Sequence, residues 1–143
     1  MLISTRSRYG LKLMYDLALK FGEQPVFLKD IASAHDISEK YLSKLVIPLR
    51  GVGLISSFRG AHGGYALARE PRAITIREIV QVLEGEISPA AGTRARKKGE
   101  PLDTHPTERV WALLDTTVYD TLESVTLESL VQAGRAGVLN YQI

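Results

Sequence analysis

Residues 28–50 read LKDIASAHDISEKYLSKLVIPLR, and they combine two short helical patterns with a polar turn. Apolar residues recur at helical spacing from Leu28 to His35, and the segment Asp36-Ile-Ser38 then interrupts the pattern with turn chemistry. Ser38 is placed to cap a second helix, whose apolar positions 42, 45, 46 and 49 again share one face. Two short helices joined by a tight turn are typical of a helix-turn-helix motif.

The sequence that follows predicts a β-hairpin. Residues 54–58 and 65–68 have strand character, and RGAHGG separates them at positions 59–64. Glycine supplies the positive φ angles that tight turns demand, so the two runs are expected to pair. A hairpin directly after a helix-turn-helix motif indicates a wing.

Two more helices are expected to flank these elements. An amphipathic helix is predicted over roughly residues 7–21, with a buried face formed by Leu11, Met14, Tyr15, Ala18 and Phe21. After the hairpin, Thr75 and Glu78 form a Thr-x-x-Glu capping box that opens a helix ending at Gly85. The inward positions of that helix are 76, 79, 80 and 83.

The rest of the chain is predicted to hold a loop, a long helix and a short helix. Residues 88–105 lack apolar periodicity and carry a basic run at 94–98, which predicts a flexible loop. A helix is expected from Pro106, a favoured first helical residue, to Ser124, and Thr126 is placed to cap a last helix at 127–133.

An apolar stripe follows the long helix and is formed by Trp111, Leu114, Val118 and Leu122. Val110 and Leu113 widen it beyond what one small domain can cover, so we expect the same helix of a symmetric partner to pack against it. The alternative is a helix packed wholly inside the monomer.

The fold class expected from these patterns is mainly α-helical with a small β-hairpin wing. It comprises a winged helix-turn-helix domain at 1–87, a flexible loop at 88–105, a dimerisation helix and a short C-terminal helix at 106–134, and a tail at 135–143.

The charges of the 143-residue chain are unevenly distributed. Residues 1–80 hold 12 Lys and Arg against 7 Asp and Glu, whereas residues 81–143 hold 6 against 9. A basic amino-terminal half is typical of a protein that meets a polyanion, although an ordinary solvated surface has the same composition.

Composition also excludes several classes of chemistry. The chain has no cysteine, which excludes disulfides, thiolate zinc sites, cysteine-ligated iron–sulfur clusters and thiol nucleophiles. No apolar run approaches the roughly 18 residues of a membrane span, and no signal-peptide pattern follows Met1, so we expect a cytoplasmic protein without a membrane partner. His35, His62 and His105 are interpreted as surface histidines, and no cofactor is expected.

The face of the second motif helix opposite its apolar positions carries Lys40, Ser43, Lys44 and Ile47. Two cations, a hydroxyl and an apolar side chain suit the major groove of DNA, where Lys and Ser bind bases or phosphates and Ile contacts a thymine methyl. The alternative is an ordinary solvated helix face.

Two neighbouring segments offer further contacts. Arg59 and His62 stand at the tip of the predicted wing, where Arg59 would enter a minor groove or hold a phosphate and His62 would donate a hydrogen bond. Arg6 and Arg8 are expected to precede the first helix and to bind phosphates, which adds affinity without sequence preference.

Several motifs in order resemble the Rrf family of bacterial winged-helix repressors: Ser4-Thr-Arg6, Arg8-Tyr9-Gly10, Ile37-Ser38, Tyr41-Leu42, Leu49-Arg50, Gly53-Leu54, Arg59-Gly60, Gly63-Gly64-Tyr65, Ile74-Thr75 and Leu83-Glu-Gly85. The resemblance implies a homodimer with crossed long helices, bound to a palindromic operator with one recognition helix in each major groove. Pattern and resemblance together predict a set of DNA-binding residues: Arg6, Arg8, Ser38, Lys40, Tyr41, Ser43, Lys44, Ile47, Arg50, Arg59, Gly60, His62 and Gly63.

The chain departs from part of this family in two ways. Position 43 is Ser, where cluster-binding relatives often have Glu, so their base preference does not transfer. Family members that sense iron or nitric oxide hold a three-cysteine cluster in the loop corresponding to residues 88–105, and this chain has no cysteine. It resembles the cysteine-free branch, which includes the cysteine-metabolism repressor.

The tail Asn140-Tyr-Gln-Ile143 looks like the C-terminal peptide with which serine acetyltransferases enter cysteine synthase. Tyr141 and Ile143 would then bind that enzyme, with the terminal carboxylate captured by backbone donors; the alternative is an uninvolved frayed terminus.

We expect a DNA-binding transcriptional regulator that acts as a repressor, with cysteine and sulfur metabolism as its candidate target. The second hypothesis is an interaction protein that mainly binds a partner enzyme. An enzyme fits least, because the sequence has no phosphate-binding glycine loop after a strand and no recognisable catalytic triad.

Overall fold

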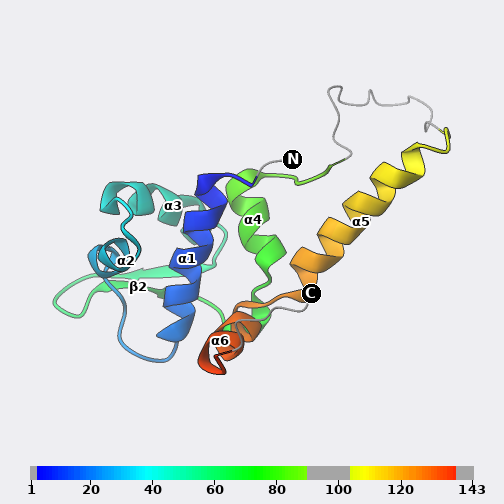
Figure 1. Cartoon of the computed structure of the whole chain (residues 1–143). Helices are drawn as coiled ribbons and strands as arrows, with labels where there is room; N and C mark the ends of the chain where they lie inside the picture. Colours follow the sequence, from blue (N-terminus) through cyan, green and yellow to red (C-terminus); the bar gives the residue numbers. More distant parts are fainter. Residues whose placement is uncertain (1–2, 90–103, 138–143) are drawn as a thin grey trace.

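The computed structural model describes residues 3–89 and 104–137. Within these ranges the chain forms helices and a two-stranded antiparallel hairpin with these bounds: α1 Thr5–Leu19, α2 Leu28–His35, α3 Glu39–Gly51, β1 Ile55–Phe58, β2 Gly64–Leu67, the 3₁₀ helix η1 Pro71–Ala73, α4 Ile76–Glu84, α5 Glu108–Ser124 and α6 Leu127–Arg135. The predicted fold class is confirmed. Figure 1 shows α1–α4, the hairpin and α6 gathered into one body, from which α5 projects.

The core of this body surrounds α1, which contacts α3, α4 and α6. Leu13 and Leu17 on α1 are fully buried, and they were not on the predicted apolar face. Phe21 was expected on that face, but it is 43% exposed because α1 ends at Leu19 and Phe21 lies in the following turn. With neighbours on several sides, α1 buries a wider face than the periodicity of its own sequence indicates.

The predicted helix caps are confirmed at Ser38, Thr75 and Thr126, whose side-chain oxygens each accept a backbone N–H from the first turn. The predicted capping box at Thr75 is only half formed, since the Glu78 carboxylate pairs instead with the Arg69 guanidinium. A charged donor is the stronger partner for a carboxylate.

The hairpin pairs Ile55 with Leu67 at its base and Phe58 with Gly64 at its tip. Val26 adds a further bridge to this sheet, since its N–H and C=O each bond to Tyr65 at 2.8 Å. This bridge ties the wing to the segment just before α2. The wing and the helix-turn-helix are therefore joined by backbone hydrogen bonds as well as by the chain itself.

The C-terminal helix α6 packs into the core of the body, although the sequence grouped it with the long helix. Leu127 is fully buried and Val131 is 6% exposed. The backbone joins the start of α4 to the start of α6, with bonds from Ile76 N to Val125 O at 2.9 Å and from Leu127 N to Ile74 O at 3.0 Å. The helix continues to Arg135, two residues beyond the predicted end.

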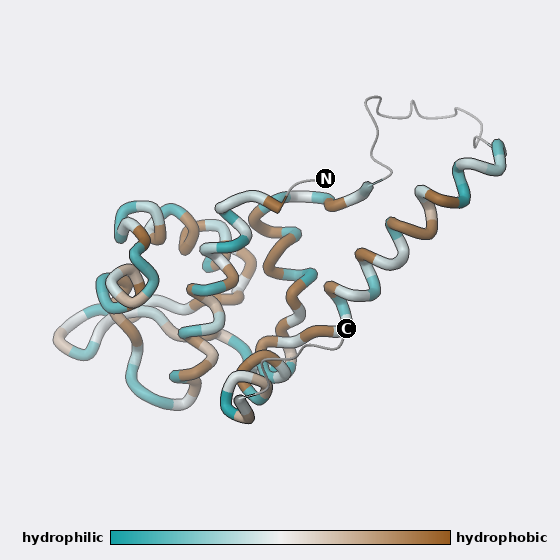
Figure 2. Tube along the Cα trace, in the orientation of Figure 1, coloured by the Kyte–Doolittle hydropathy of each residue, from teal (hydrophilic) through white to brown (hydrophobic). Residues whose placement is uncertain are grey.

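Helix α5 begins at Glu108 rather than at Pro106, because residues 105–108 form a turn in which Glu108 N bonds to His105 O at 2.9 Å. None of its residues is buried, so the alternative of a helix packed wholly inside the monomer is wrong. Figure 2 shows hydrophobic segments recurring along its whole length. None of the described helices has both the length and the apolar character needed to cross a membrane.

Candidate nucleic-acid interface

Helix α3 presents a polar and cationic face away from the core. Leu42, Leu45, Val46 and Leu49 are buried, as predicted, while a second set lies in solvent: Lys40, Ser43, Lys44 and Ile47. Ile47 is 61% exposed, which is unusual for an aliphatic side chain on a helix with buried neighbours. An apolar side chain between cations is available for a base edge or a thymine methyl.

The hydroxyl groups of α3 are partly engaged within the protein. Ser38 Oγ accepts the Tyr41 N–H at 3.3 Å as the helix cap, and Ser43 Oγ donates to the Glu39 carbonyl at 2.9 Å. In this arrangement the Ser43 hydroxyl proton is used within the helix, and the oxygen keeps lone pairs that can accept a further hydrogen bond.

Tyr41 links the recognition helix to α1. Its ring meets the ring of Tyr9 edge to face, with centroids 5.8 Å apart, and it is half-buried. Lys12 Nζ lies 5.9 Å from the centroid of the Tyr9 ring. The amino-terminal turns of α1 and α3 therefore lie side by side and bring their cations to one region of the surface.

The wing carries exposed and structural residues in the same turn. Arg59, Gly60 and His62 are exposed between the two strands. Gly63, predicted to contact DNA, is buried, and a Cβ at this position would lie 2.7 Å from the Phe58 carbonyl oxygen. Gly63 closes the turn by its N–H bond to Gly60 O at 2.9 Å, so it has a structural role in the wing, and its contact with DNA stays a prediction.

Arg50 at the end of α3 reaches the wing. Its Nη1 donates to Ser57 Oγ on β1 at 3.4 Å, and both side chains are exposed. The structure thus places Arg50 between the recognition helix and the hairpin. A phosphate bound there would meet a guanidinium whose position is already restricted.

A groove of about 480 Å³ between the start of α2, α3 and the wing shows residues that the sequence did not single out. Phe27 and Phe58 line it and are 42% and 51% exposed. Lys29 lines it too, with its Nζ 5.5 Å from the centroid of the Phe27 ring. Of these groove residues, only Lys29 could have been found from the sequence, because it is a cation on the polar face of the α2 pattern. The exposure of Phe27 and Phe58 cannot be predicted from the sequence.

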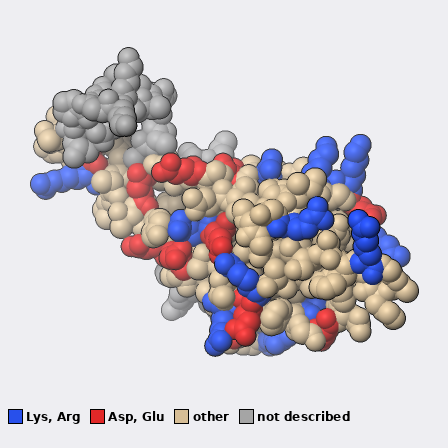
Figure 3. All heavy atoms as spheres, turned by 180° about the vertical axis from the view of Figure 1, so that it is seen from behind, with Lys and Arg blue, Asp and Glu red and all other residues tan. Residues whose placement is uncertain are grey.

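Arg6 and Arg8 lie in the first turns of α1, so the prediction that they precede this helix is wrong. Both side chains are exposed. Figure 3 shows Lys and Arg side chains standing out from the winged body, with acidic side chains among them, and further acidic side chains towards the projecting part of the molecule.

Glu84, which the sequence did not assign a role, holds the start of α1. Its Oε1 accepts the Ser4 N–H at 2.9 Å, the Ser7 hydroxyl at 2.7 Å and the Ser4 hydroxyl. These bonds from Ser4 and Ser7 lower the pKa of Glu84 and keep it ionised. Ser4 is itself the N-cap of α1, so the carboxylate sits against the positive end of that helix.

The predicted dimerisation stripe divides into two parts. Val118 and Leu122 are half-buried towards α4, whereas Trp111 and Leu114 are 45% and 42% exposed on the projecting half of α5. Leu113 beside them is 66% exposed. The outer half of the helix therefore presents the larger apolar surface.

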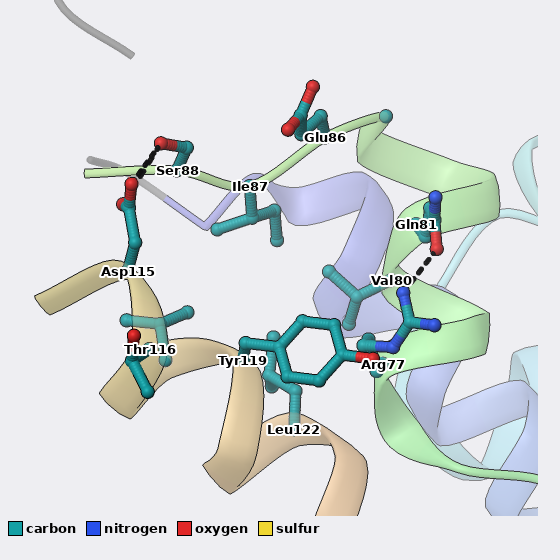
Figure 4. Close-up of a pocket in the computed structure, with 12 residues that line it drawn as sticks. Arg77, Val80, Gln81, Glu86, Ile87, Ser88, Asp115, Thr116, Tyr119 and Leu122 are labelled. Atoms are coloured by element: carbon teal, nitrogen blue, oxygen red, sulfur yellow. Dashed lines mark hydrogen bonds between the residues drawn. The ribbon is translucent and has the colours of Figure 1, made fainter. Parts of the chain in front are cut away.

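A cleft of about 460 Å³ separates α4 from α5 (Figure 4). Arg77 spans one end of it: its Nε donates to Glu123 at 2.8 Å, its Nη1 to Gln81 at 2.8 Å, and its guanidinium lies 4.6 Å from the centroid of the Tyr119 ring. The hydrogen bond to Glu123 raises the pKa of Arg77. At the other end, Ser88 Oγ lies 2.9 Å from the carboxylate oxygens of Asp115. These contacts connect α5 to α4 and to the segment that follows α4.

The histidines have local partners or stand in solvent. His35 Nε2 lies 2.8 Å from Asp16 Oδ2, and His105 Nδ1 lies 2.7 Å from Thr107 Oγ1. Among residues 3–89 and 104–137, no group of three His, Asp or Glu side chains is arranged to hold a metal ion. Tyr141 and Ile143 lie outside the described residues, so their predicted role stays a prediction.

The exposed face of α3, the wing beside it and the projecting α5 together define a winged helix-turn-helix DNA-binding regulator. The chain belongs to the Rrf2 family, whose model, described as "Rrf2: Iron-dependent Transcriptional regulator", matches residues 3–133. This is a family of transcriptional regulators and not of enzymes.

Known relatives agree with this assignment in sequence and in structure. The HTH-type transcriptional regulator CymR of Bacillus subtilis is 47% identical over 131 residues, which cover 91% of this chain and 89% of CymR. A solved structure of B. subtilis CymR, described as the global cysteine regulator, has a TM-score of 0.78 at 46% identity, covering 92% of this chain and 97% of that one. T. potens IscR has a TM-score of 0.80 at 38% identity, covering 98% and 93%.

The family description refers to iron, but the donors of this chain do not fit an iron–sulfur cluster. Such clusters are held mainly by cysteine thiolates, and the sequence contains no cysteine.

Proposed function

We propose that this protein is a repressor that reads a specific DNA sequence with α3 and holds the backbone with the wing and α1. The exposed face of α3 carries the proposal, since Lys40, Lys44 and Ile47 project from a helix whose other face is packed in the core. Arg59 at the wing tip would enter the adjacent minor groove or bind a phosphate. A regulator that binds DNA in this way would be located in the cytoplasm, where the bacterial DNA lies.

We propose further that it acts as a homodimer on a palindromic operator. The support is the apolar surface on the outer half of α5, where Trp111, Leu113 and Leu114 stay exposed in the single chain. Two chains joined through this helix would carry two recognition helices related by a twofold axis. Half-sites would lie about 34–36 Å apart, or a multiple of this distance.

The proposed targets are genes of cysteine and sulfur metabolism. The support is the 47% identity to CymR, since the solved structure of that protein describes it as a global cysteine regulator. The 131 matched residues include the helix-turn-helix motif and the wing, because they span 91% of the chain. The direct test is whether purified protein binds promoters of sulfur-assimilation genes from its host in preference to unrelated promoters.

Fluorescence anisotropy with a labelled duplex from the region upstream of its own operon tests the DNA-binding face. Wild-type protein should bind, with an affinity that falls steeply as salt rises. The triple charge reversal Lys40→Glu/Lys44→Glu/Arg59→Glu should abolish binding, because it places three carboxylates against phosphates. The single reversal Lys40→Glu is compared with Lys20→Glu, which changes the net charge equally at an exposed position at the far end of α1, beside Glu23, and should bind more tightly than Lys40→Glu. Regulation that survives the triple reversal in cells would contradict the proposal.

A partner enzyme is the second proposal, and it is supported by the sequence of the tail alone. The tail ends in Tyr141-Gln-Ile143, which suits capture of an apolar side chain and a terminal carboxylate by cysteine synthase. A pull-down with purified cysteine synthase should lose binding when Ile143 is deleted. Unchanged binding by the deleted chain would remove this proposal and leave the DNA-binding function untouched.

A further inference from the structure

Glu84 connects two parts of the protein that are 80 residues apart in sequence. Its Oε1 accepts the Ser4 N–H at 2.9 Å and the Ser7 hydroxyl at 2.7 Å, and it also accepts the Ser4 hydroxyl. Ser7 is 2% exposed, so its hydroxyl depends on this carboxylate for a hydrogen-bond acceptor. Three donors on one oxygen make a tight clamp on the first turn of α1.

The clamp supplies what α1 lacks at its own start. The first turn of α1 contains no acidic residue, and its N-cap Ser4 is followed three positions later by Ser7 rather than by Glu or Gln. Glu84 brings the missing negative charge from α4 to the positive end of α1. The position of the first turn of α1 is therefore set by another helix.

Two exposed cations stand on this clamped turn. Arg6 lies between Ser4 and Ser7, and the Arg8 N–H donates to the Ser4 carbonyl at 3.2 Å. One residue further, Tyr9 packs edge to face on Tyr41 at the start of α3. The clamp thus fixes both arginines relative to the recognition helix.

The segment that follows Glu84 contacts the long helix α5. Glu84 is the last residue of α4, and the next residues, Gly85 to Ser88, line the cleft against α5. Ser88 bonds to Asp115 of α5 at 2.9 Å. The segment from Gly85 to Ser88 therefore connects the carboxylate of Glu84 to α5.

We propose that Glu84 is a positioning residue for DNA binding, which holds Arg6 and Arg8 in place for the phosphate backbone and links their position to α5. This inference rests on the proposed DNA contacts of the two arginines. The charge of Glu84 alone and the proposed clamp predict opposite effects of its substitution. If Glu84 acted only through its charge, its removal would tighten DNA binding, because a carboxylate repels phosphates. If Glu84 positions the two arginines, its removal weakens DNA binding.

The salt dependence of DNA binding tests this proposal with the full chain. The slope of log K against log salt is measured by anisotropy, with the duplex from the upstream region of its own operon, for Glu84→Ala, Glu84→Gln, Arg6→Ala/Arg8→Ala and the combined Glu84→Ala/Arg6→Ala/Arg8→Ala variant. Removal of the arginines should reduce the slope by about 0.9 for each phosphate that they neutralise in the wild-type complex. Glu84→Ala should reduce it by a similar amount, and the combined variant should show no greater reduction, because both changes act on the same phosphates.

Glu23→Gln is the control, because Glu23 is exposed in the turn after α1, at the opposite end of that helix from Ser4 and Ser7, and its substitution changes the net charge equally. This variant should bind as tightly as the wild type or more tightly. If Glu84→Ala does not give a folded circular-dichroism spectrum, the test uses Glu84→Gln, which should bind more weakly and with a smaller slope than Glu23→Gln.

Three results would overturn the inference: a wild-type slope for the folded Glu84 variants, reductions that add fully in the combined variant, or a wild-type slope after removal of both arginines. If the Glu84 substitutions only lower the stability of the protein, the slope of log K against log salt stays at its wild-type value at temperatures where the variants are folded. Failure of the wild-type protein to bind any duplex would instead overturn the proposed function, and this inference with it.

Discussion

Gly10 of α1 and Leu83 of α4 meet where the two helices cross, and a Cβ built at position 10 would lie 2.1 Å from Cδ1 of Leu83. Leu83 is 5% exposed, so it has little room to move away. The crossing places the next residue of α4, Glu84, within reach of Ser4 and Ser7. A close helix contact in the core thus determines the geometry at the start of α1.

Gly10→Ala should destabilise the protein, by about 1–3 kcal/mol from overpacking, although alanine is the better helix former. Urea unfolding followed by circular dichroism measures the change. Gly51→Ala is the control, because position 51 ends α3 with no atom within 4 Å of its added Cβ. That variant should be as stable as the wild type or slightly more stable. Equal effects of the two substitutions would contradict the close crossing.

The clamp at Glu84 should make stability depend on pH in the acid range. Its hydrogen bonds lower the pKa of Glu84 below the ordinary value of 4.5, so the unfolded state binds the proton more strongly. The stabilisation is fully present above pH 4.5 and is lost as pH falls through the lower pKa of the folded protein. We expect the difference in unfolding free energy between wild type and Glu84→Gln to narrow below pH 4.5. Urea titrations at stepped pH measure it, and a difference that is the same at every pH would refute the clamp.

Lys44 and Arg8 should affect DNA binding differently. Lys44→Ala, on the exposed face of α3, should reduce the preference for operator over a scrambled duplex, since a good base contact contributes about 1–3 kcal/mol of discrimination. Arg8→Ala should weaken binding to both duplexes by the same factor, because phosphate contacts carry no sequence information. Competition titrations with the two duplexes measure both effects. A change in preference from Arg8→Ala would show that this residue reads bases.

Trp111→Asp should convert the proposed dimer into a monomer, because it puts a carboxylate into the apolar surface on α5. Sedimentation velocity at micromolar concentration measures the mass. Ser33→Asp on the exposed face of α2 adds the same charge far from α5 and should leave the mass unchanged. A wild-type protein that already sediments as a monomer at every concentration would rule out the α5 dimer.

Local signals in the sequence predicted much of the fold. The bounds of α2 and the caps at Ser38, Thr75 and Thr126 were predicted correctly, because capping oxygens and helical periodicity act within a few residues. The burial of Leu13 and Leu17 was missed, because it depends on which helices surround α1. The packing of α6 into the core was missed for the same reason. The sequence of a short amphipathic helix shows that one face will be buried, but not which other helices it will pack against.

The candidate site was predicted less completely than the fold. The cationic face of α3 followed from its helical wheel, and the structure leaves these residues exposed. The clamp by Glu84 could not be seen, because it joins residues about 80 positions apart. One indirect signal existed, namely an N-cap serine at position 4 without an acidic partner three residues later.

The two backbone bonds that join residues 74–76 to 125–127 make the inner end of α5 a pivot fixed to the body. The 17 residues of α5 span about 25 Å, so a rotation of about 10° at this pivot moves the outer end by about 4 Å. In the proposed homodimer, joined at the outer ends of α5, such a tilt would change the distance between the two recognition helices, while neither winged body would have to deform. The length of α5 would therefore turn a small change of angle at its inner end into a larger change in the spacing of the half-sites that the dimer accepts.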